Sequence, residues 1–97
     1  MEDEMKAIIC AGTHGRAVVY GEIEGDVLPR PNTSVEIKDA RMILYWGGTA
    51  GLFGLASKGP EEGSRITAHV TDVTCAVCEA LAVSAMAAEV IDGWPDE

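Results

Sequence analysis

Short segments in which apolar and polar residues alternate recur along this 97-residue chain, and they constrain its fold more than any other feature. Alternation with period two is typical of β-strands. Turn-forming residues separate several of the segments, as in DVLPRPNTS at residues 26–34. Together with one short apolar run at the start, the pattern predicts strands over residues 5–11, 16–24, 35–38, 40–46, 64–70 and 73–83.

The alanine-rich stretch after Asp72 is open to two interpretations, because alanine favours helices. Over residues 73–83, however, larger side chains alternate with smaller ones, which indicates a strand closely covered on one face. From Ser84 onward the apolar residues recur with helical spacing, and Gly-Trp-Pro follows as a stop signal. The sequence therefore predicts a strand over 73–83 and a helix over 85–92, with Ser84 as its N-cap.

The segment ARMILYWGGTAGLFGLASKGP, residues 40–60, joins a strand to the other predicted helix. Strand 40–46 is largely apolar on both faces, so a helix or a neighbouring subunit should cover its second face. The spacing then changes, which predicts a helix over 49–58 with Thr49 as N-cap and Gly59 just beyond its end. The two-sided apolar strand also leads us to expect a homo-oligomer.

These elements indicate an α+β fold. We expect a small, mainly antiparallel sheet or partly closed barrel of about six short strands, with two short helices at about 49–58 and 85–92. The length predicts a single domain, residues 1–97. The acidic ends, residues 1–4 and 95–97, are expected to be flexible.

The charge balance argues against several classes of partner. Seven Lys and Arg face sixteen Asp and Glu, a net charge of −9. A nucleic-acid polymer requires a basic face, and this chain has no basic run. No apolar run approaches the ~20 residues that span a membrane, and the start MEDEMK lacks the basic region of a signal peptide. We therefore expect a cytoplasmic protein (in the host cell if a phage encodes it) whose cysteines are thiols.

Three elements resemble a family of small phage and prophage proteins of unknown function. They are THGRAVVYGEI at residues 13–23, ARMILYWGGTAGLFGLA at 40–56 and AAEVIDGW at 87–94. The resemblance implies a glycine-containing second strand, a strand ending in Tyr-Trp, a small-residue turn into a helix, and a short terminal helix ending at Trp. Met42 follows Arg41 where relatives could carry a second basic residue, which leaves one candidate anion contact fewer. The family implies no activity.

One group of residues could bind a small anion of the nucleotide type. Gly47, Gly48 and Thr49 precede a predicted helix, whose first N–H groups lack partners and carry the positive end of the helix dipole. Aromatic rings just before them could stack on a purine, and glycines around His14 would let the backbone approach a ligand. The predicted ligand-binding set is His14, Arg16, Arg41, Tyr45, Trp46, Gly47, Gly48, Thr49 and Lys58. The alternative interpretation is purely structural: the same residues could form a core strand, a glycine turn and a core helix without binding a ligand.

Motifs for catalysis are missing from the sequence. Cys75 and Cys78 have the spacing of a redox dithiol or half a zinc site. On a strand, however, residues three apart point to opposite faces, so the two thiols could not share one metal. His14 and His69 accompany no nucleophile, zinc or phosphate-loop motif. We therefore expect no catalytic residue, no metal and no cofactor.

Three functions remain as hypotheses. The first is a small phage-encoded, oligomeric binding protein that sequesters a nucleotide-derived molecule, such as a host immune signal. The second is a structural or assembly accessory protein of a phage particle, without a small-molecule ligand. The third, an enzyme or a zinc or redox protein, rests on the CxxC spacing alone. The sequence favours the first and gives least support to the third.

Overall fold

The computed structural model describes residues 4–12, 17–47, 51–69 and 72–96. Every pair of neighbouring strands in this part of the chain is antiparallel. The elements are β1 (Glu4–Ala11), β2 (Ala17–Glu24), β3 (Ser34–Gly47), α1 (Gly51–Lys58), β4 (Glu61–Ile66), β5 (Val73–Ala82) and α2 (Ala85–Asp92). The expected α+β fold with a mainly antiparallel sheet and two short helices is therefore confirmed.

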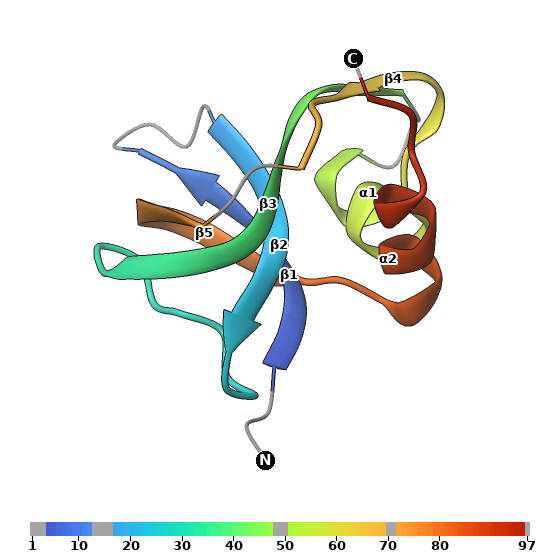
Figure 1. Cartoon of the computed structure of the whole chain (residues 1–97). Helices are drawn as coiled ribbons and strands as arrows, with labels where there is room; N and C mark the ends of the chain where they lie inside the picture. Colours follow the sequence, from blue (N-terminus) through green and yellow to red (C-terminus); the bar gives the residue numbers. More distant parts are fainter. Residues whose placement is uncertain (1–3, 13–16, 48–50, 70–71, 97) are drawn as a thin grey trace.

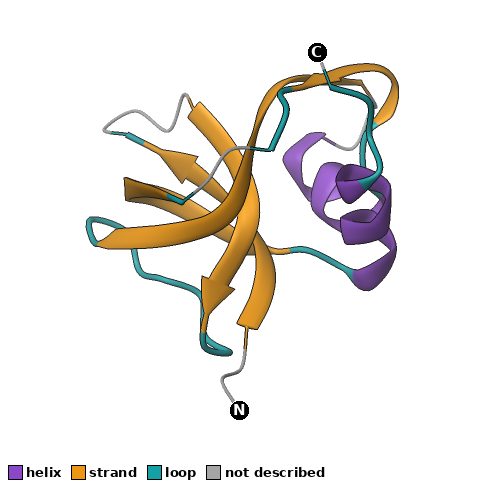
Figure 2. Cartoon of the chain, viewed as in Figure 1, coloured by secondary structure: helices purple, strands orange, loops and turns teal. Residues whose placement is uncertain are grey.

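The sheet is curled, because one long strand pairs with three others. Its strand order is β2-β1-β5-β3-β4, and β2 also pairs with β3. Successive parts of β3 pair first with β5, then with β2 and finally with β4. Figure 1 shows β3 as a long arc that ends above the helices. Helices α1 and α2 lie together on one side of the strands (Figure 2).

β3 combines two strands that the sequence predicted separately, 35–38 and 40–46. The backbone runs on through Asp39, which has a positive φ of 53°. Lys38 and Arg41, on either side of it, both pair with β2. The unusual residue therefore bends the strand without ending it, and the described chain has five strands instead of about six.

β4 is displaced from the predicted strand 64–70. It begins at Glu61 and ends at Ile66. Beyond Ile66 the Thr67 N–H donates to the Met42 carbonyl (2.9 Å), while the Thr67 carbonyl accepts from Arg41 Nε (2.7 Å). The hydrogen-bond ladder between β3 and β4 ends here because the Arg41 side chain, and not the backbone of β3, donates to the Thr67 carbonyl. The strand predicted over 73–83 is confirmed as β5, one residue shorter.

Each face of the sheet contributes buried side chains to a hydrophobic cluster. The cluster on the side of the helices comprises Ile8, Cys10, Val18, Tyr20, Ile43, Leu55, Ala56, Ile66, Leu81, Ala88 and Ile91. The inner cluster, enclosed by the curled strands, comprises Ala7, Ile9, Ala11, Val19, Ile23, Ile37, Ala40 and Val77. Alternate residues of β1 belong to the two clusters, which explains why residues 5–11 form a continuous apolar run.

The second face of the segment 40–46 is not covered within the described chain. Met42 and Leu44 remain 42% and 46% exposed, whereas Ile43 packs in the cluster on the side of the helices. The expected cover by a helix is therefore wrong for this face. Cover by a neighbouring subunit stays a prediction.

Gly21 allows β2 and β3 to approach closely. A Cβ atom at this position would lie 2.7 Å from the carbonyl oxygen of Lys38 and would overlap the side chain of Ile37. Real Cβ atoms do not tolerate such contacts with backbone, so the crossing of the two strands requires glycine.

Two of the predicted helix caps are confirmed. Ser84 has extended backbone angles, and its Oγ accepts from the Ala87 N–H at 3.0 Å. Gly59 follows α1 with φ of 90°, and its N–H donates to the Leu55 carbonyl at 3.0 Å. Thr49, the predicted N-cap of α1, lies outside the described residues. Neither described helix is long and apolar enough to cross a membrane.

Candidate functional site

The guanidinium of Arg41 points into the protein. Arg41 is completely buried. Its nitrogens donate to the carbonyls of Thr67 (2.7 Å) and Ile91 (2.6 Å) and to Asp96 Oδ1 (2.9 Å). The Asp96 side chain is 61% exposed, so this ion pair has one buried and one solvated member. The hydrogen bonds of Arg41 thus connect the sheet to the end of α2 and to the segment that follows it.

Further polar contacts hold the same C-terminal segment. The Tyr20 hydroxyl donates to Asp92 Oδ1 (2.9 Å), and the Trp94 indole donates to the carbonyl of Ser64 (3.0 Å). Burial, reinforced by the bond to Asp92, raises the pKa of Tyr20 well above its ordinary value. Glu4 belongs to β1 and Asp96 is bound by Arg41, so these two positions differ from the expectation of loose ends. Sequence reasoning missed this network, whose one signal was an arginine on an apolar strand face.

The predicted aromatic residues have different environments. Tyr45 is 58% exposed and lies opposite Arg65 of β4. Trp46 is partly buried against the cluster on the side of the helices, and Gly47 ends β3. Tyr45 is therefore available to a partner, whereas Trp46 contributes to the core. The predicted residues His14, Arg16, Gly48 and Thr49 lie outside the described residues.

Lys58 lies at the wrong end of α1 for the predicted anion site. The helix has eight residues, so its last residue stands about 10 Å along the axis from its first turn. With Arg41 turned inward, the described members of the predicted ligand set do not converge at the start of α1. The structure thus separates cations that the sequence had grouped.

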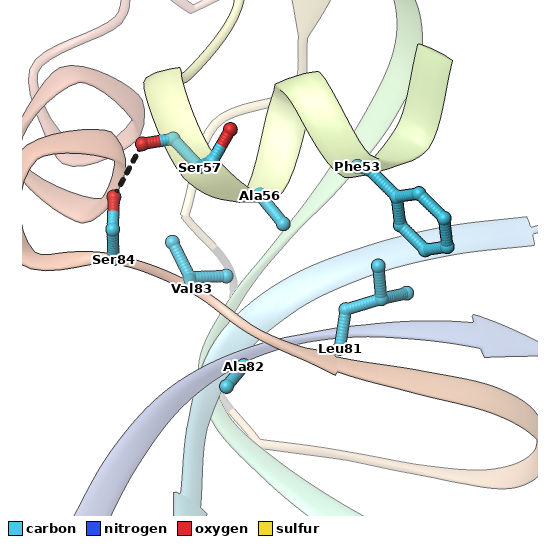
Figure 3. A pocket seen from close by; sticks show the side chains of 7 residues that line it. All are labelled: Phe53, Ala56, Ser57, Leu81, Ala82, Val83 and Ser84. Carbon is cyan, nitrogen blue, oxygen red and sulfur yellow. Dashed lines mark hydrogen bonds between the residues drawn. The ribbon is translucent and has the colours of Figure 1, made fainter. Parts of the chain in front are cut away.

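An apolar groove runs between α1 and the end of β5 (Figure 3). We call it the helix groove; it has a volume of about 510 Å³ and is lined by Phe53, Ala56, Ser57, Leu81, Ala82, Val83 and Ser84. Phe53 reaches from α1 toward Leu81 in Figure 3 and is 73% exposed. At the other end, Ser84 Oγ donates to the carbonyl of Ser57 (2.6 Å). None of the described residues that line this groove is charged.

A second hollow is polar. We call it the loop pocket; it has a volume of about 490 Å³ and is lined by Gly12, Pro31, Asn32, Thr33, Ser34, Ala76, Val77 and Cys78. The loop is held against β5 by hydrogen bonds of 2.8 Å, from the Asn32 N–H to the Val77 carbonyl and from the Val77 N–H to the Thr33 carbonyl. Asn32 has a φ of 68°, a conformation that asparagine tolerates better than most residues. Among the described residues, the lining offers amide, hydroxyl and thiol groups and no charged side chain.

The three cysteines differ in exposure. Cys78 is exposed at a bulge where the register of β1 and β5 shifts, whereas Cys75 packs against the inner cluster. Burial raises the pKa of the Cys10 and Cys75 thiols. Among the described residues, no three His, Cys, Asp or Glu side chains are grouped as a metal site. Cys78 is therefore the thiol most accessible to a reagent in solution.

Comparison with known proteins identifies a family without an assigned activity. The family described as a domain of unknown function (DUF6948) matches residues 5–91. No curated protein and no solved structure matches the chain. Since the match covers most of its length, the chain belongs to the DUF6948 family.

Proposed function

We propose that this member of the DUF6948 family is a binding protein without catalytic activity, which captures a small anionic, nucleotide-type molecule. The loop pocket is the site that best suits this role among the described residues. Its volume of about 490 Å³ falls within the ~300–1,000 Å³ usual for ligand sites. One observation carries the proposal: the described lining of the pocket has hydrogen-bonding groups and no carboxylate, in a chain with a net charge of −9.

The absence of a carboxylate from the lining favours an anionic ligand over a cationic one. Asn32, Thr33 and Ser34 present an amide and hydroxyl groups that can donate to phosphate or carbonyl oxygens. A nearby carboxylate would repel such a ligand, and none of the described residues that line the pocket carries one. The proposed binding site is therefore the loop before β3, whereas the sequence had predicted a site at the start of α1.

The resemblance to small phage and prophage proteins supports a finer version of the proposal. A phage that encodes a small, oligomeric binding protein could use it to remove a nucleotide-derived signal of the host's defence. Sequestration needs tight binding and abundance but no chemistry, which agrees with a sequence that carries no catalytic motif.

The test begins with the intact protein and a panel of nucleotides and cyclic nucleotides. A ligand present at 100 times its Kd should raise the free energy of unfolding by about 2.7 kcal/mol, which a thermal-shift assay would detect. Incubation with an extract of infected cells, followed by mass spectrometry of what the protein retains, would identify natural ligands. Retention of no metabolite in either experiment would refute the proposal.

A matched pair of variants tests the position of the site. Asn32→Asp keeps the shape of the side chain and its tolerance of positive φ but adds a negative charge to the pocket, so it should weaken anion binding at least about tenfold. Ala85→Asp adds the same charge at the exposed start of α2, away from the pocket lining, and should leave binding unchanged. Equal binding by both variants would show that the ligand binds elsewhere.

The exposed apolar side chains support a second candidate, an accessory protein that assembles into a larger particle. Phe53, Tyr45 and Met86 are 73%, 58% and 58% exposed. Scattered apolar residues are normal on a surface, but a contiguous patch indicates a partner. Association with purified phage particles, together with no retained metabolite, would favour this function.

A further inference from the structure

β5 has one unpaired edge near its end. The Val83 N–H donates to the Lys6 carbonyl of β1 (3.1 Å), and the register pairs Leu81 with Ile8. Because backbone groups alternate in direction along a strand, those of Leu81 and Val83 face β1, whereas those of Ala80 and Ala82 face away from it.

The strand on the other side stops before this point. β3 pairs with residues 73–76 of β5, and the Val77 N–H bonds the Thr33 carbonyl just before β3 begins. No described strand pairs with Ala80 or Ala82 on this side. Ala82 is exposed, and an unpaired strand edge is a template for pairing with another chain.

The helix groove lies along this edge. It is lined by four consecutive residues, 81–84, whose side chains alternate between the two faces of the sheet. A groove that contacts side chains on both faces of a strand also contacts the edge of its backbone, because the edge lies between the two faces. In Figure 3, Phe53 and Ala56 of α1 stand over the groove while Ala82 points away from the helix. The apolar side chains of Phe53 and Ala56 therefore lie where they could cover a strand added at the open edge.

We propose that the helix groove is the interface of a symmetric homodimer, in which the ends of two β5 strands pair antiparallel. A twofold axis at Leu81 places Ala80 of one copy opposite Ala82 of the second, and the outward backbone groups of each satisfy those of the other. Phe53 of each copy then covers the added strand. The small side chains of Ala80 and Ala82 leave room for the approach, and both strands keep their bonds to β1.

Charge complementarity selects a second copy as the occupant. Glu79 precedes the open edge, and Lys58 follows Ser57 at the opposite end of the groove. Within the described chain, neither Glu79 nor Lys58 has an ion-pair partner. Antiparallel pairing about Leu81 brings Glu79 of one copy to Val83 of the other, beside its Lys58. Two symmetric Glu–Lys pairs result, whereas parallel pairing would bring like charges together.

The mass of the full chain in solution tests the dimer. Sedimentation equilibrium should give twice the chain mass of 10.2 kDa and show a concentration-dependent dissociation. Ala82→Pro removes an N–H that faces the second copy, and proline is tolerated at strand edges, so this variant should be a monomer with the far-UV spectrum of the native protein. A monomeric wild-type protein, or a dimeric Ala82→Pro variant, would overturn the proposal.

Ala85→Pro is the matched control. Ala85 is the first residue of α2, where proline is favoured, and Ser84 before it already has the extended angles (φ −64°, ψ 158°) that precede proline. This variant carries the same substitution three residues from Ala82 but off the edge, so it should remain a dimer. Loss of the dimer in both variants would contradict edge pairing as the cause.

A charge-reversal cycle keeps the proposal testable even if Ala82→Pro fails to fold. Glu79→Lys and Lys58→Glu each place like charges together across the interface and should raise the dimer Kd by about tenfold. The double variant reverses both charges and should restore the Kd to within about threefold. Additive weakening in the double variant would refute antiparallel pairing. Ligand retention should be unaffected by Ala82→Pro, and dimerisation by Asn32→Asp, so failure of this proposal is distinct from failure of the loop-pocket site.

Discussion

Replacing Arg41 with alanine should destabilise the protein severely, because this one side chain joins three separate segments. Its hydrogen bonds reach the Thr67 carbonyl after β4, the Ile91 carbonyl in α2, and Asp96 beyond α2. Arg41→Ala removes all three bonds together and leaves a cavity where the side chain was fully buried.

The expected loss of stability follows from these contacts. Each hydrogen bond lost from the charged guanidinium costs about 1.5–3 kcal/mol, while the Ile91 carbonyl keeps the Trp94 N–H as a donor at 3.1 Å. Asp96 loses its partner at little cost, because its side chain is 61% exposed and water solvates it. Relief from burying a guanidinium offsets part of the loss, and breaking buried pairs of this kind typically costs about 3–5 kcal/mol in total. For a domain of this size, 3 kcal/mol corresponds to a fall in Tm of at least about 12 °C.

Urea denaturation followed by circular dichroism would measure the change. Arg30→Ala is the control, since Arg30 is an exposed loop arginine, and its free energy of unfolding should change by less than about 0.5 kcal/mol. Asp96→Asn should cost less than about 1 kcal/mol, which separates the ion pair from the two carbonyl bonds. A loss below 1 kcal/mol in Arg41→Ala would refute the reasoning.

Three further predictions concern the stability of the fold. Gly21→Ala should lower the free energy of unfolding by about 1–3 kcal/mol in urea denaturation, because its Cβ would press on the backbone of β3; an unchanged midpoint would contradict the close crossing. Because burial and a bond to Asp92 raise the pKa of Tyr20 above its ordinary 10.0, the neutral phenol stabilises the fold below pH 10, and this contribution is lost as the pH rises through the raised pKa. Stability measured from pH 8 to 11 should therefore fall less steeply in Tyr20→Phe, and parallel curves would count against this cause. Ser84→Ala should cost about 1 kcal/mol as a lost N-cap, and Ser57→Ala, which keeps the backbone carbonyl that Ser84 contacts, should cost less.

Several elements of the fold were predictable because their signals are local. The alternation of large and small residues in 73–83 identified β5 against a strong helix propensity, because period two is a property of strands. The bulge at Cys78 then places Val77 in the inner cluster and Leu81 in the cluster on the side of the helices, which the alternation did not predict. Ser84 and Gly59 marked helix ends because capping depends on the residue itself and its nearest backbone groups.

The candidate site was less predictable, for a physical reason that the lysine and arginine illustrate. Lys58 follows the strand that contains Tyr45 and Trp46 closely in sequence. It is the last residue of α1, however, and therefore lies about 10 Å along the helix axis from the first residue. Arg41 was grouped with surface cations because it is charged, yet it bonds to carbonyls from residues 67 and 91. The loop pocket carried no motif at all, since its polar lining comes from a turn, a bulge and the end of β1.

The sequence by itself determined the fold class, the strand and helix character of most segments, and the acidic charge balance. These depend on residue periodicity and charge, which are properties of neighbouring residues along the chain. Tertiary structure alone decided that β3 is one bent strand, that Arg41 is buried and bonded to distant segments, and that one edge of β5 near its end pairs with no described strand. These three features depend on contacts between segments that are far apart in the sequence. Burial and hydrogen-bond partners are fixed only when those segments come together.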